Sequence, residues 1–332
     1  MSSKLTFGYL YDFRNPPQWK RRPEDLYAEI LDVVSWTEGA GFDGAWVPEH
    51  HLAEDAYMPS PLIALAAMAA RTKRLKLGSG IALAPLYHPL RFAEDCAVLD
   101  ILSGGRLEMG FAIGYRRREY AAFGVDFTKR GRIFDEWLQI VTRLWAGEEV
   151  SFQGQHFTLT AAKLMPAAPR GRIPVYIGSF TEKAMERVAR YGDGFIGSGE
   201  LCDLYAEKLR QQGKSQATAR VRVTDLFFAV AHDPERAMHE LAPFYHHVNN
   251  SYGEWFNEDK SVEGLKTMSL EEFKSSGILQ ILTPEAAIAM LKAKQQRMPL
   301  EHVMMMMPPG LPAERFIEYA QIFASEVVPA FK

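Results

Sequence analysis

The stretch Gly41-Phe-Asp-Gly-Ala-Trp46 joins a predicted helix to a predicted buried strand, and it decides the fold because it recurs. Residues 24–38 before it place apolar side chains at the spacing of one helical face, and Gly39 and Gly41 end that helix. The stretch Tyr191-Gly-Asp-Gly-Phe-Ile196 repeats the junction in the second half of the chain. The recurrence indicates a chain built from similar helix–strand units.

The same unit appears at a regular interval. Strands are expected to begin near residues 43, 75 and 106, roughly every 31 residues, with helices over 60–71 and 90–102 between them. Strands that alternate with amphipathic helices indicate βαβ units and a parallel sheet. The pattern predicts eight strands, the number that closes a (β/α)₈ barrel; they cover residues 5–11, 43–47, 75–82, 106–111, 174–178, 193–197, 222–230 and 301–307. An open doubly wound sheet is the main alternative, and it would need an edge strand that the sequence does not show.

Two segments do not fit the simple repeat. Residues 149–159 alternate polar and apolar side chains around Gln153-Gly154, which predicts a β-hairpin inserted before the fifth strand. Residues 249–283 show no clear unit, and a segment that long in a compact domain is more often an active-site lid than an idle loop. An ordinary surface helix with loops is the alternative.

Composition excludes several classes of protein. A chain of 332 residues with 47% hydrophobic and 24% charged residues suits a single barrel domain over 1–332. The net charge of −3 argues against duplex nucleic acid as a partner. Cys96 and Cys202 form neither a disulfide framework nor a zinc site, as expected in a reducing cytoplasm. The N-terminal residues do not resemble a signal peptide, and no apolar run is long enough to cross a bilayer, so we expect a soluble cytoplasmic protein.

In a barrel of this type, chemistry lies on the loops after the carboxyl ends of the strands. The loop after the second strand carries Pro48-Glu-His-His51. A histidine there can act as acid, base or hydrogen-bond donor near neutral pH, so His50 is the candidate catalytic residue. Paired histidines can also bind metal, but adjacent side chains diverge and no third ligand lies nearby, so we expect no metal and a structural role for His51.

The next two loops contain candidates for ligand contact. Gly80 would let the backbone approach a flat ligand, although it can equally serve helix–strand packing. After the fourth strand, Tyr115 is the candidate, while Arg117 and Arg118 are expected to be solvated.

A phosphate site is predicted after the fifth strand. Gly178-Ser-Phe-Thr-Glu182 opens a helix, where unpaired N–H groups and the helix dipole favour an anion. A plain N-cap by Ser179 or Thr181 is the simpler interpretation. Arg132, one turn before the apolar face of the preceding helix, could supply the positive charge.

Three further residues are candidates for the substrate pocket. Tyr11 ends the first strand, His88 lies in the loop after the third, and Met305 belongs to the run Met304-Met-Met-Met307. A methionine run is usually core, but its adaptable surface could also form the floor of an apolar pocket.

Seven motifs in order resemble the bacterial luciferase-like flavin monooxygenases, from about residue 5 to 200 and more weakly beyond. They are Glu49-His50-His51, Leu86-Tyr-His-Pro89, Leu99-Asp-Ile-Leu-Ser-Gly-Gly-Arg-Leu107, Glu119-Tyr-Ala-Ala-Phe-Gly124, Arg132-Ile-Phe-Asp-Glu136, Pro174-Val-Tyr-Ile-Gly178 and Gly192-Asp-Gly194.

The resemblance implies a (β/α)₈ barrel, often dimeric, with His50 as the catalytic histidine. It implies a non-prolyl cis peptide at Gly80-Ile81 beside the flavin ring. It also implies phosphate contacts from Arg132 and from the segment Gly178 to Thr181, which includes Phe180.

The activity implied is a two-component monooxygenase that uses O₂ and reduced FMN, supplied by a separate flavin reductase, on a small and largely apolar substrate. A coenzyme F420-dependent dehydrogenase or reductase fits the same barrel, and so does a flavin-binding barrel without catalysis. A sugar- or phosphate-handling barrel is a weaker option. Ala112, Ile113 and Phe180 replace a cysteine, an arginine and a glutamate of luciferase α-subunits, which argues against light emission.

Overall fold

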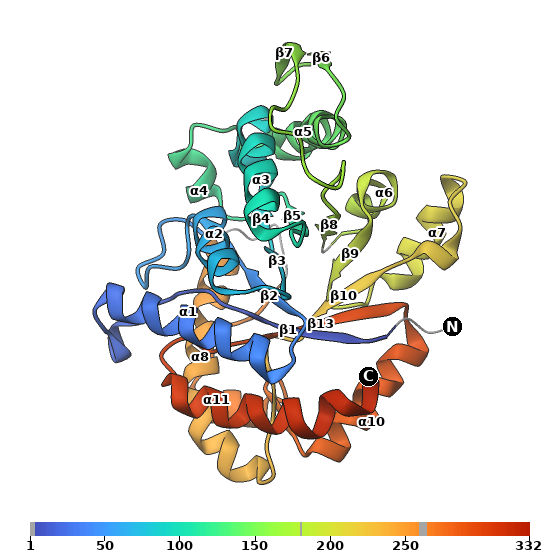
Figure 1. Ribbon diagram of the computed structural model, residues 1–332. Coiled ribbons are helices and arrows are strands. Elements are labelled where there is room, and N and C mark those ends of the chain that lie inside the picture. The colour runs from blue at the N-terminus through green and yellow to red at the C-terminus, as the bar shows by residue number, and fades with distance from the viewer. Residues whose placement is uncertain (1–3, 180, 259–263) are drawn as a thin grey trace.

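The computed structural model describes residues 4–179, 181–258 and 264–332, and within them a parallel sheet of nine strands encloses the core (Figure 1). Neighbouring strands follow the order β3-β2-β1-β13-β10-β9-β8-β5-β4, with every pair parallel. Their bounds are β1 Thr6–Leu10, β2 Gly44–Val47, β3 Lys76–Ser79, β4 Ala82–Leu83, β5 Met109–Ala112, β8 Val175–Gly178, β9 Gly194–Gly197, β10 Val221–Thr224 and β13 Leu300–Met306.

Two of the nine strands occupy one position of the barrel. β3 and β4 are consecutive pieces separated only by Gly80 and Ile81, whose peptide bond is cis, as the resemblance implies. β4 pairs with β5. β3 pairs with the residues just before β5: the N–H of Leu77 donates to the carbonyl of Arg106 (3.1 Å), and the N–H of Glu108 donates to the carbonyl of Leu77 (2.8 Å). These bonds close the sheet, and the predicted (β/α)₈ barrel is confirmed.

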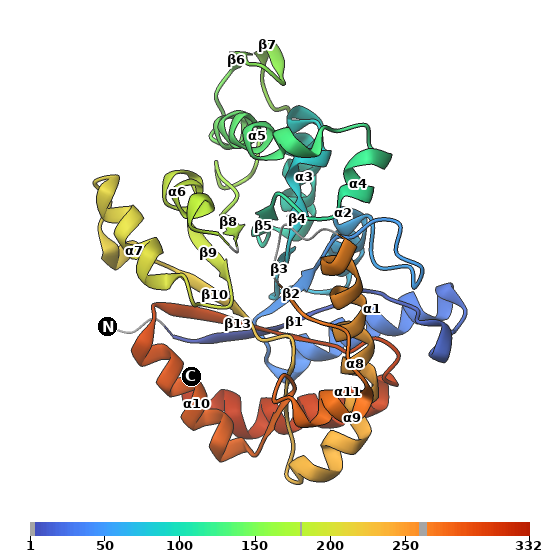
Figure 2. The same ribbon diagram turned by 180° about the vertical axis from the view of Figure 1, so that it is seen from behind.

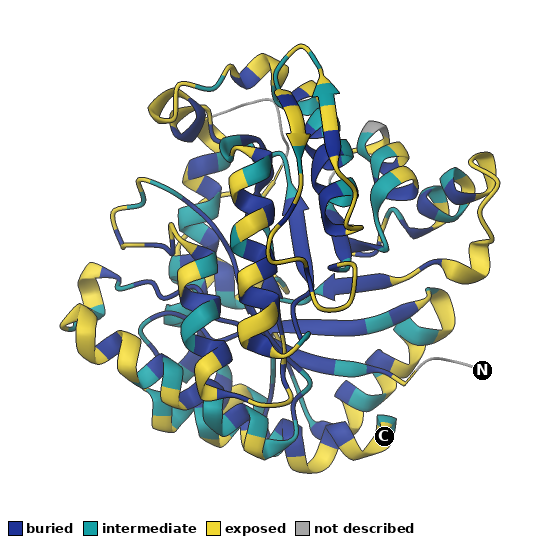
Figure 3. Ribbon diagram, turned by 45° about the horizontal axis from the view of Figure 1, so that its top comes forward, coloured by how far each residue is buried: buried dark blue, intermediate teal, exposed yellow. Residues whose placement is uncertain are grey.

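Helices cover the outside of the barrel, and their inward faces carry the buried side chains (Figure 3). Strands and helices alternate along the chain close to the predicted spacing. The view from behind shows the helices arranged around the sheet (Figure 2). The helices are α1 Pro23–Ala40, α2 Pro61–Arg71, α3 Pro89–Ser103, α4 Arg117–Ala122, α5 Arg130–Trp145, α6 Glu182–Tyr191, α7 Cys202–Gln211, α8 Pro234–Glu258, α9 Leu270–Ser275, α10 Pro284–Arg297 and α11 Ala313–Ile322. Among the described residues, none of them combines the length and the hydropathy that a bilayer crossing needs.

The hairpin predicted over 149–159 is present as β6 Val150–Gln153 and β7 Thr158–Ala162, which pair antiparallel. It projects from the barrel beyond α5 (Figure 1). The carboxylate of Glu136 on α5 accepts the N–H groups of Gln155 and His156 in its turn (2.8 and 2.9 Å), so the insertion is attached to the helix before it.

The strand expected over 222–230 is divided. After β10 the chain leaves the barrel at Asp225 and forms β11 Phe228–Val230, which pairs in parallel with β12 Gln280–Leu282 in a separate two-stranded sheet. The segment 249–283 also has more regular structure than its sequence indicates, because it begins inside α8 and contains α9 and β12. Pro243 interrupts the helical pattern of α8 in the sequence, although the helix continues through it.

A polar network fills the amino end of the barrel interior. The indole Nε1 of Trp46 donates to Nε2 of His302 (2.8 Å), and the guanidinium of Arg222 lies 4.9 Å from the Trp46 ring. Arg222 is ion-paired with Glu108 and Glu301. An indole can only donate, so the proton of the neutral His302 ring sits on Nδ1, 2.8 Å from Thr6 Oγ1. This end of the barrel is closed by packed side chains, which leaves the opposite mouth for a ligand.

The titration of His302 provides a test of this network. Burial, and then the charge of Arg222, lowers the pKa of His302 well below its usual value. The ring therefore stays neutral in the folded chain but takes up a proton in the unfolded chain below about pH 6.5, so stability should fall by up to about 1.4 kcal/mol per pH unit below that value. Urea denaturation of His302→Gln should show a flatter pH dependence, whereas His232→Gln on the surface should not. An unchanged slope in His302→Gln would contradict a neutral His302.

Candidate active site

His50 lies in the loop after β2, at the carboxyl mouth of the barrel, and is only 7% exposed. Its Nδ1 is 2.9 Å from Oε1 of Glu119, a fully buried residue of α4. The same oxygen accepts the backbone N–H of His51 (2.9 Å) and a longer bond from Nη1 of Arg116 (3.3 Å). Three donors therefore converge on one carboxylate oxygen, and this carboxylate fixes the orientation of the His50 ring.

The ionisation of Glu119 decides which nitrogen of His50 carries a proton. Burial alone would raise the pKa of Glu119, but the hydrogen bonds from His50 and His51 and the charge of Arg116 outweigh it, so the pKa lies below its ordinary value. An ionised carboxylate can only accept, so Nδ1 of His50 donates the proton. Nε2 is then the nitrogen that can take up or release a proton.

His51 points away from its neighbour. Its Nε2 lies 2.8 Å from Oε1 of Glu49, and its ring packs on Phe123. Glu49 also accepts the hydroxyl of Tyr87 (2.6 Å) and the N–H of Leu83 (2.7 Å), which ties this loop to β4. The two histidines thus bind different carboxylates, and their positions do not favour a shared metal ion.

Aromatic rings surround the His50 ring on several sides. The ring centroids of Trp255 and Tyr57 lie 4.7 and 4.9 Å away, and those of Tyr115 and Tyr252 lie 5.7 and 5.9 Å away. Trp255 and Tyr252 belong to α8, which Figure 2 shows rising toward α2 and α4. The walls around the exchangeable nitrogen are therefore largely apolar, which favours chemistry shielded from water.

Small residues form a platform across the barrel mouth at the carboxyl ends of β3, β5 and β8. A Cβ atom built on Gly178 would lie 3.4 Å from Ile81 Cγ2 and 3.6 Å from Ala112 Cβ, which places these three residues together. Gly80 and Ile81 are partly exposed, as are Ala112 and Gly178. Apart from Ile81, these residues carry at most a methyl group, and such a surface can receive a flat ring system.

The predicted phosphate positions lie beside this platform. Thr181 is the N-cap of α6 but makes no side-chain cap hydrogen bond, while Ser179 Oγ accepts the N–H of Thr181 (3.0 Å). Arg132 is exposed in the first turn of α5, and that turn packs on α6 because Arg187 bonds both Asp135 (2.6 Å) and the carbonyl of Gly131 (3.1 Å). Phe180 lies outside the described residues. The helix end and the arginine are thus on neighbouring helices, an arrangement that suits a phosphate group.

Comparison with known proteins identifies the family. Residues 5–279 match the model of the family described as luciferase-like monooxygenase. The chain belongs to the luciferase-like monooxygenase family. An alkanal monooxygenase alpha chain from the Kryptophanaron alfredi symbiont is 30% identical over 188 residues, which cover 55% of this chain and 52% of that protein. An F420-dependent glucose-6-phosphate dehydrogenase from Amycolatopsis mediterranei is 31% identical and covers 59% of this chain and 61% of its own length. The chain thus spans less than two thirds of each of these two relatives.

A third relative aligns over almost the whole chain. The oxygenase component of a flavin-dependent trigonelline monooxygenase from Acinetobacter baylyi is 26% identical, with 93% of this chain and 91% of that protein covered. Among solved structures, the monooxygenase RslO1 from Streptomyces bottropensis superposes with a TM-score of 0.85 at 22% identity, covering 99% of this chain and all of that one. That structural likeness shows the luciferase-like fold.

Two residues expected in the substrate pocket of this luciferase-like barrel lie away from His50. Tyr11 is buried on the outer side of the barrel, where its hydroxyl is 3.2 Å from Thr37 Oγ1 of α1. His88 is exposed at the N-cap of α3, and its ring packs against Phe157 in the turn of the hairpin.

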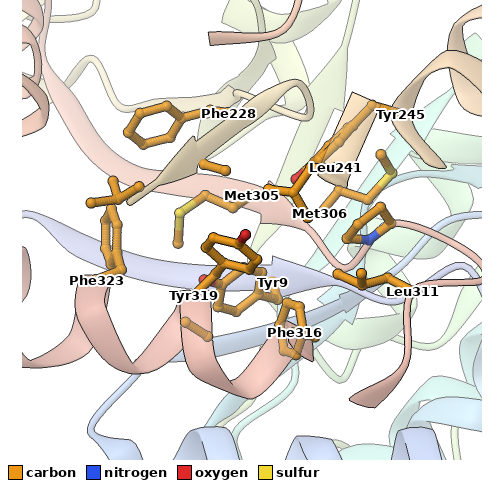
Figure 4. A pocket seen from close by; sticks show the side chains of 14 residues that line it. Tyr9, Phe228, Leu241, Tyr245, Met305, Met306, Leu311, Phe316, Tyr319 and Phe323 are labelled. Carbon is orange, nitrogen blue, oxygen red and sulfur yellow. The ribbon is translucent and has the colours of Figure 1, made fainter. Parts of the chain in front are cut away.

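Met305 also faces outward. Strand alternation puts Met304 inside the barrel, where a Cβ on Gly80 would lie 3.3 Å from its sulfur, so Met305 points to the opposite face. There it lines an apolar cavity with Tyr9, Phe228 and Tyr245, between the barrel and the helices α8 and α11 (Figure 4).

Several residues that surround His50 in this luciferase-like barrel have no strong sequence pattern that predicts a place in the active site. Glu119 follows the charged run Arg116-Arg-Arg118 at the start of a short helix, which is the pattern of a solvated surface, and only its place in a family motif marked it. Tyr57 follows no predicted strand directly. Tyr252 and Trp255 belong to residues 249–283, for which the sequence predicted either an active-site lid or a surface helix with loops. Tyr115, which was expected, stacks on Phe256 (4.6 Å), and its hydroxyl is buried without a hydrogen-bond partner in the described part of the chain.

Proposed function

We propose that this chain is the oxygenase of a two-component flavin monooxygenase. It would use O₂ and reduced FMN, supplied by a separate reductase in the cytoplasm, to oxygenate a small, largely apolar organic molecule. The observation that carries the proposal is the His50–Glu119 pair in an aromatic-walled site beside the platform of Gly80, Ile81 and Gly178. The trigonelline monooxygenase component, which aligns along nearly the full chain, supports an oxygenase role.

The described residues fit a flavin mononucleotide. The flat ring system suits the platform, where Gly80, Ala112 and Gly178 have no side chain beyond a methyl group. The Tyr115 hydroxyl, which is buried and has no hydrogen-bond partner among the described residues, can bond a ligand atom. The phosphate end suits the N-terminus of α6, with Ser179, Thr181 and Arg132.

Reduced flavin bound there would supply the electrons that activate O₂. The protein contributes the shielded site and one positioned proton. Nε2 of His50 exchanges this proton with the reacting oxygen, while Glu119 holds the ring and stabilises its protonated form. The rings of Tyr57, Tyr252 and Trp255 exclude water. We also propose that the segment 249–283 covers the site, since its α8 part carries two of these rings.

A deazaflavin-dependent dehydrogenase or reductase is the second candidate function. The F420-dependent glucose-6-phosphate dehydrogenase named above supports it. So does the fold of an F420-dependent secondary alcohol dehydrogenase, which superposes with a TM-score of 0.74 at 20% identity over 99% of both chains. The platform would suit a deazaflavin ring equally well, with hydride transfer replacing oxygen activation.

Mixing the pure chain with each cofactor separates these functions. Under the main proposal, the chain binds reduced FMN tightly under anaerobic conditions. When ¹⁸O₂ is admitted, it incorporates the labelled oxygen into a substrate, which is sought in a panel of small ketones, aldehydes and N-heteroaromatic compounds. Binding of F420 together with its reduction by an alcohol, and no oxygen incorporation, would establish the second function. Flavin binding without acceleration of any reaction would indicate a non-catalytic barrel.

We further propose that the chain forms a homodimer through α2 and α3. Ile63 on α2 and Val98, Ile101 and Leu102 on α3 are large apolar side chains exposed by 43–74%, and the two helices pack side by side. Such a patch suits a self-complementary interface. Sedimentation velocity should give a dimer for the native chain and a monomer for Ile63→Glu/Leu102→Glu. A dimer should persist in Met165→Glu, an exposed apolar position elsewhere; a native monomer would refute the dimer.

A further inference from the structure

Trp255 reaches the active site from the C-terminal part of α8, a helix whose first half packs on the outside of the barrel through Leu241 and Tyr245. It lies near the C-terminal end of α8, is 7% exposed, and its ring is the closest aromatic ring to His50 among those described. α8 belongs to the excursion between β11 and β12, outside the barrel sheet. The position of Trp255 over His50 therefore also depends on contacts between the C-terminal half of α8 and the loops at the barrel mouth.

A buried polar cluster makes these contacts. Arg14, in the loop after β1, is 1% exposed and donates from Nε to Oδ2 of Asp55 (2.6 Å) in the loop after β2. Its Nη2 donates to Oγ of Ser251 (2.6 Å). Nε2 of His247 lies 2.8 Å from the same oxygen of Asp55. Two residues of the barrel loops thus bind two residues one turn apart on α8; we call these four the α8 latch.

Trp255 also lies against two guanidinium groups. The carbon centre of Arg116 is 4.3 Å from its ring centroid and that of Arg14 is 5.7 Å away, both within cation–π range. Arg116 is the residue that bonds Glu119, the partner of His50. Trp255 therefore connects the α8 latch to the catalytic pair.

A latch made of buried charges specifies a position more than it adds stability. The cost of removing an ion pair from water largely offsets its attraction, so apolar residues would hold α8 as firmly. Apolar contacts, however, tolerate sliding, whereas the bonds from Arg14 to Ser251 and between His247 and Asp55 form in one register of the helix. A shift of α8 by one turn would separate Ser251 and His247 from the ion pair, and Arg14 and Asp55 would each lose a buried hydrogen-bond partner.

We propose that Arg14 is a positioning residue that, through the α8 latch, sets the Trp255 ring over His50 and so shields the catalytic nitrogen from bulk water. The proposal rests on the proposed function of His50. It implies that residues 249–258, the first part of the segment 249–283, form a fixed wall of the site. Without the latch or the ring, His50 becomes accessible from solvent.

The accessibility of His50 can be measured without cofactor or substrate. Diethyl pyrocarbonate acylates accessible histidine rings, and peptide mass spectrometry gives the rate at each histidine. We expect His50 to react slowly in the native chain and roughly tenfold faster in Trp255→Ala and Arg14→Met, because the reactive population follows the local opening equilibrium. Ser251→Ala, a milder change in the latch, should give a smaller increase. Trp36→Ala, the same truncation on α1, should leave the His50 rate unchanged.

His302 separates positioning from general loss of stability. It is 4% exposed and lies in the opposite end of the barrel. In Arg14→Met the rates at His50 and His247 should rise while the rate at His302 stays low, and hydrogen exchange should rise in 247–258. A parallel rise at His302, or an unchanged His50 rate in Trp255→Ala, would overturn the proposal. Failure of the native chain to bind reduced FMN under anaerobic conditions would instead overturn the proposed function, and the histidine rates could still be interpreted.

Discussion

Replacing His50 with alanine is expected to lower turnover by about 10²–10⁴-fold, the usual contribution of a positioned acid or base. The ring is the only imidazole among the described residues that four aromatic rings enclose beside the platform, and Nε2 is its exchangeable nitrogen. Flavin affinity and the far-UV circular dichroism spectrum should remain near native, because the histidine is not part of the barrel sheet. Single-turnover product formation with reduced FMN, compared with the anaerobic dissociation constant, measures both effects.

The matched control for His50→Ala is His232→Ala. The His232 side chain is 63% exposed and is paired only with Glu326 in the described structure, so its loss should change neither quantity. Full turnover in His50→Ala would remove the histidine from the mechanism, and a loss of flavin affinity equal to the loss of turnover would assign it to binding.

Glu119→Gln is expected to have the second-largest effect. All three donors meet Oε1, so an amide that keeps its oxygen there still accepts their hydrogen bonds, but it removes the negative charge that faces the His50 ring and Arg116. Turnover should fall by a factor on the order of 10²–10⁴, as it does where a carboxylate that fixes a histidine tautomer is replaced by an amide.

A double-mutant cycle distinguishes this positioning role from a loss of folding. Breaking a buried charge pair costs about 3–5 kcal/mol of stability, so Glu119→Gln should also lower the denaturation midpoint. In a His50→Ala background the substitution should still lower stability but should reduce turnover no further. Additive losses of turnover would contradict the assignment of Glu119 to His50.

The barrel could be predicted from the sequence because its signals are local and repeated. The helix–turn–strand junction at 41–46, its copy at 191–196 and the regular spacing of strands depend on a few neighbouring residues each. The β3–β4 interruption at Gly80 and Ile81 did not disturb the count of eight barrel positions, since β3 and the first residue of β4 fall within the single predicted strand 75–82.

Side-chain direction was harder to predict than the strands themselves. Met304 and Met305 are adjacent, yet one faces the barrel interior and the other the helix layer, because a shift of one residue reverses the face. Tyr11 shows the same effect at the end of β1. Glu119 and Trp255 were out of reach for another reason: they contact His50 across 69 and roughly 200 residues of chain, and no local pattern records such contacts.

The pairing of β11 with β12 has a consequence for how the protein can diversify. The chain leaves the barrel after β10 and returns beside its own exit point, where Phe228, Ala229 and Val230 align with Gln280, Ile281 and Leu282. Residues 231–279 are therefore an insertion whose two ends lie side by side in the β11–β12 pair. Its length and sequence can change, or be exchanged between relatives as a cassette, without altering the register of β10 against β13. Natural selection can thus remodel the wall over His50 while the scaffold that carries His50 is inherited unchanged.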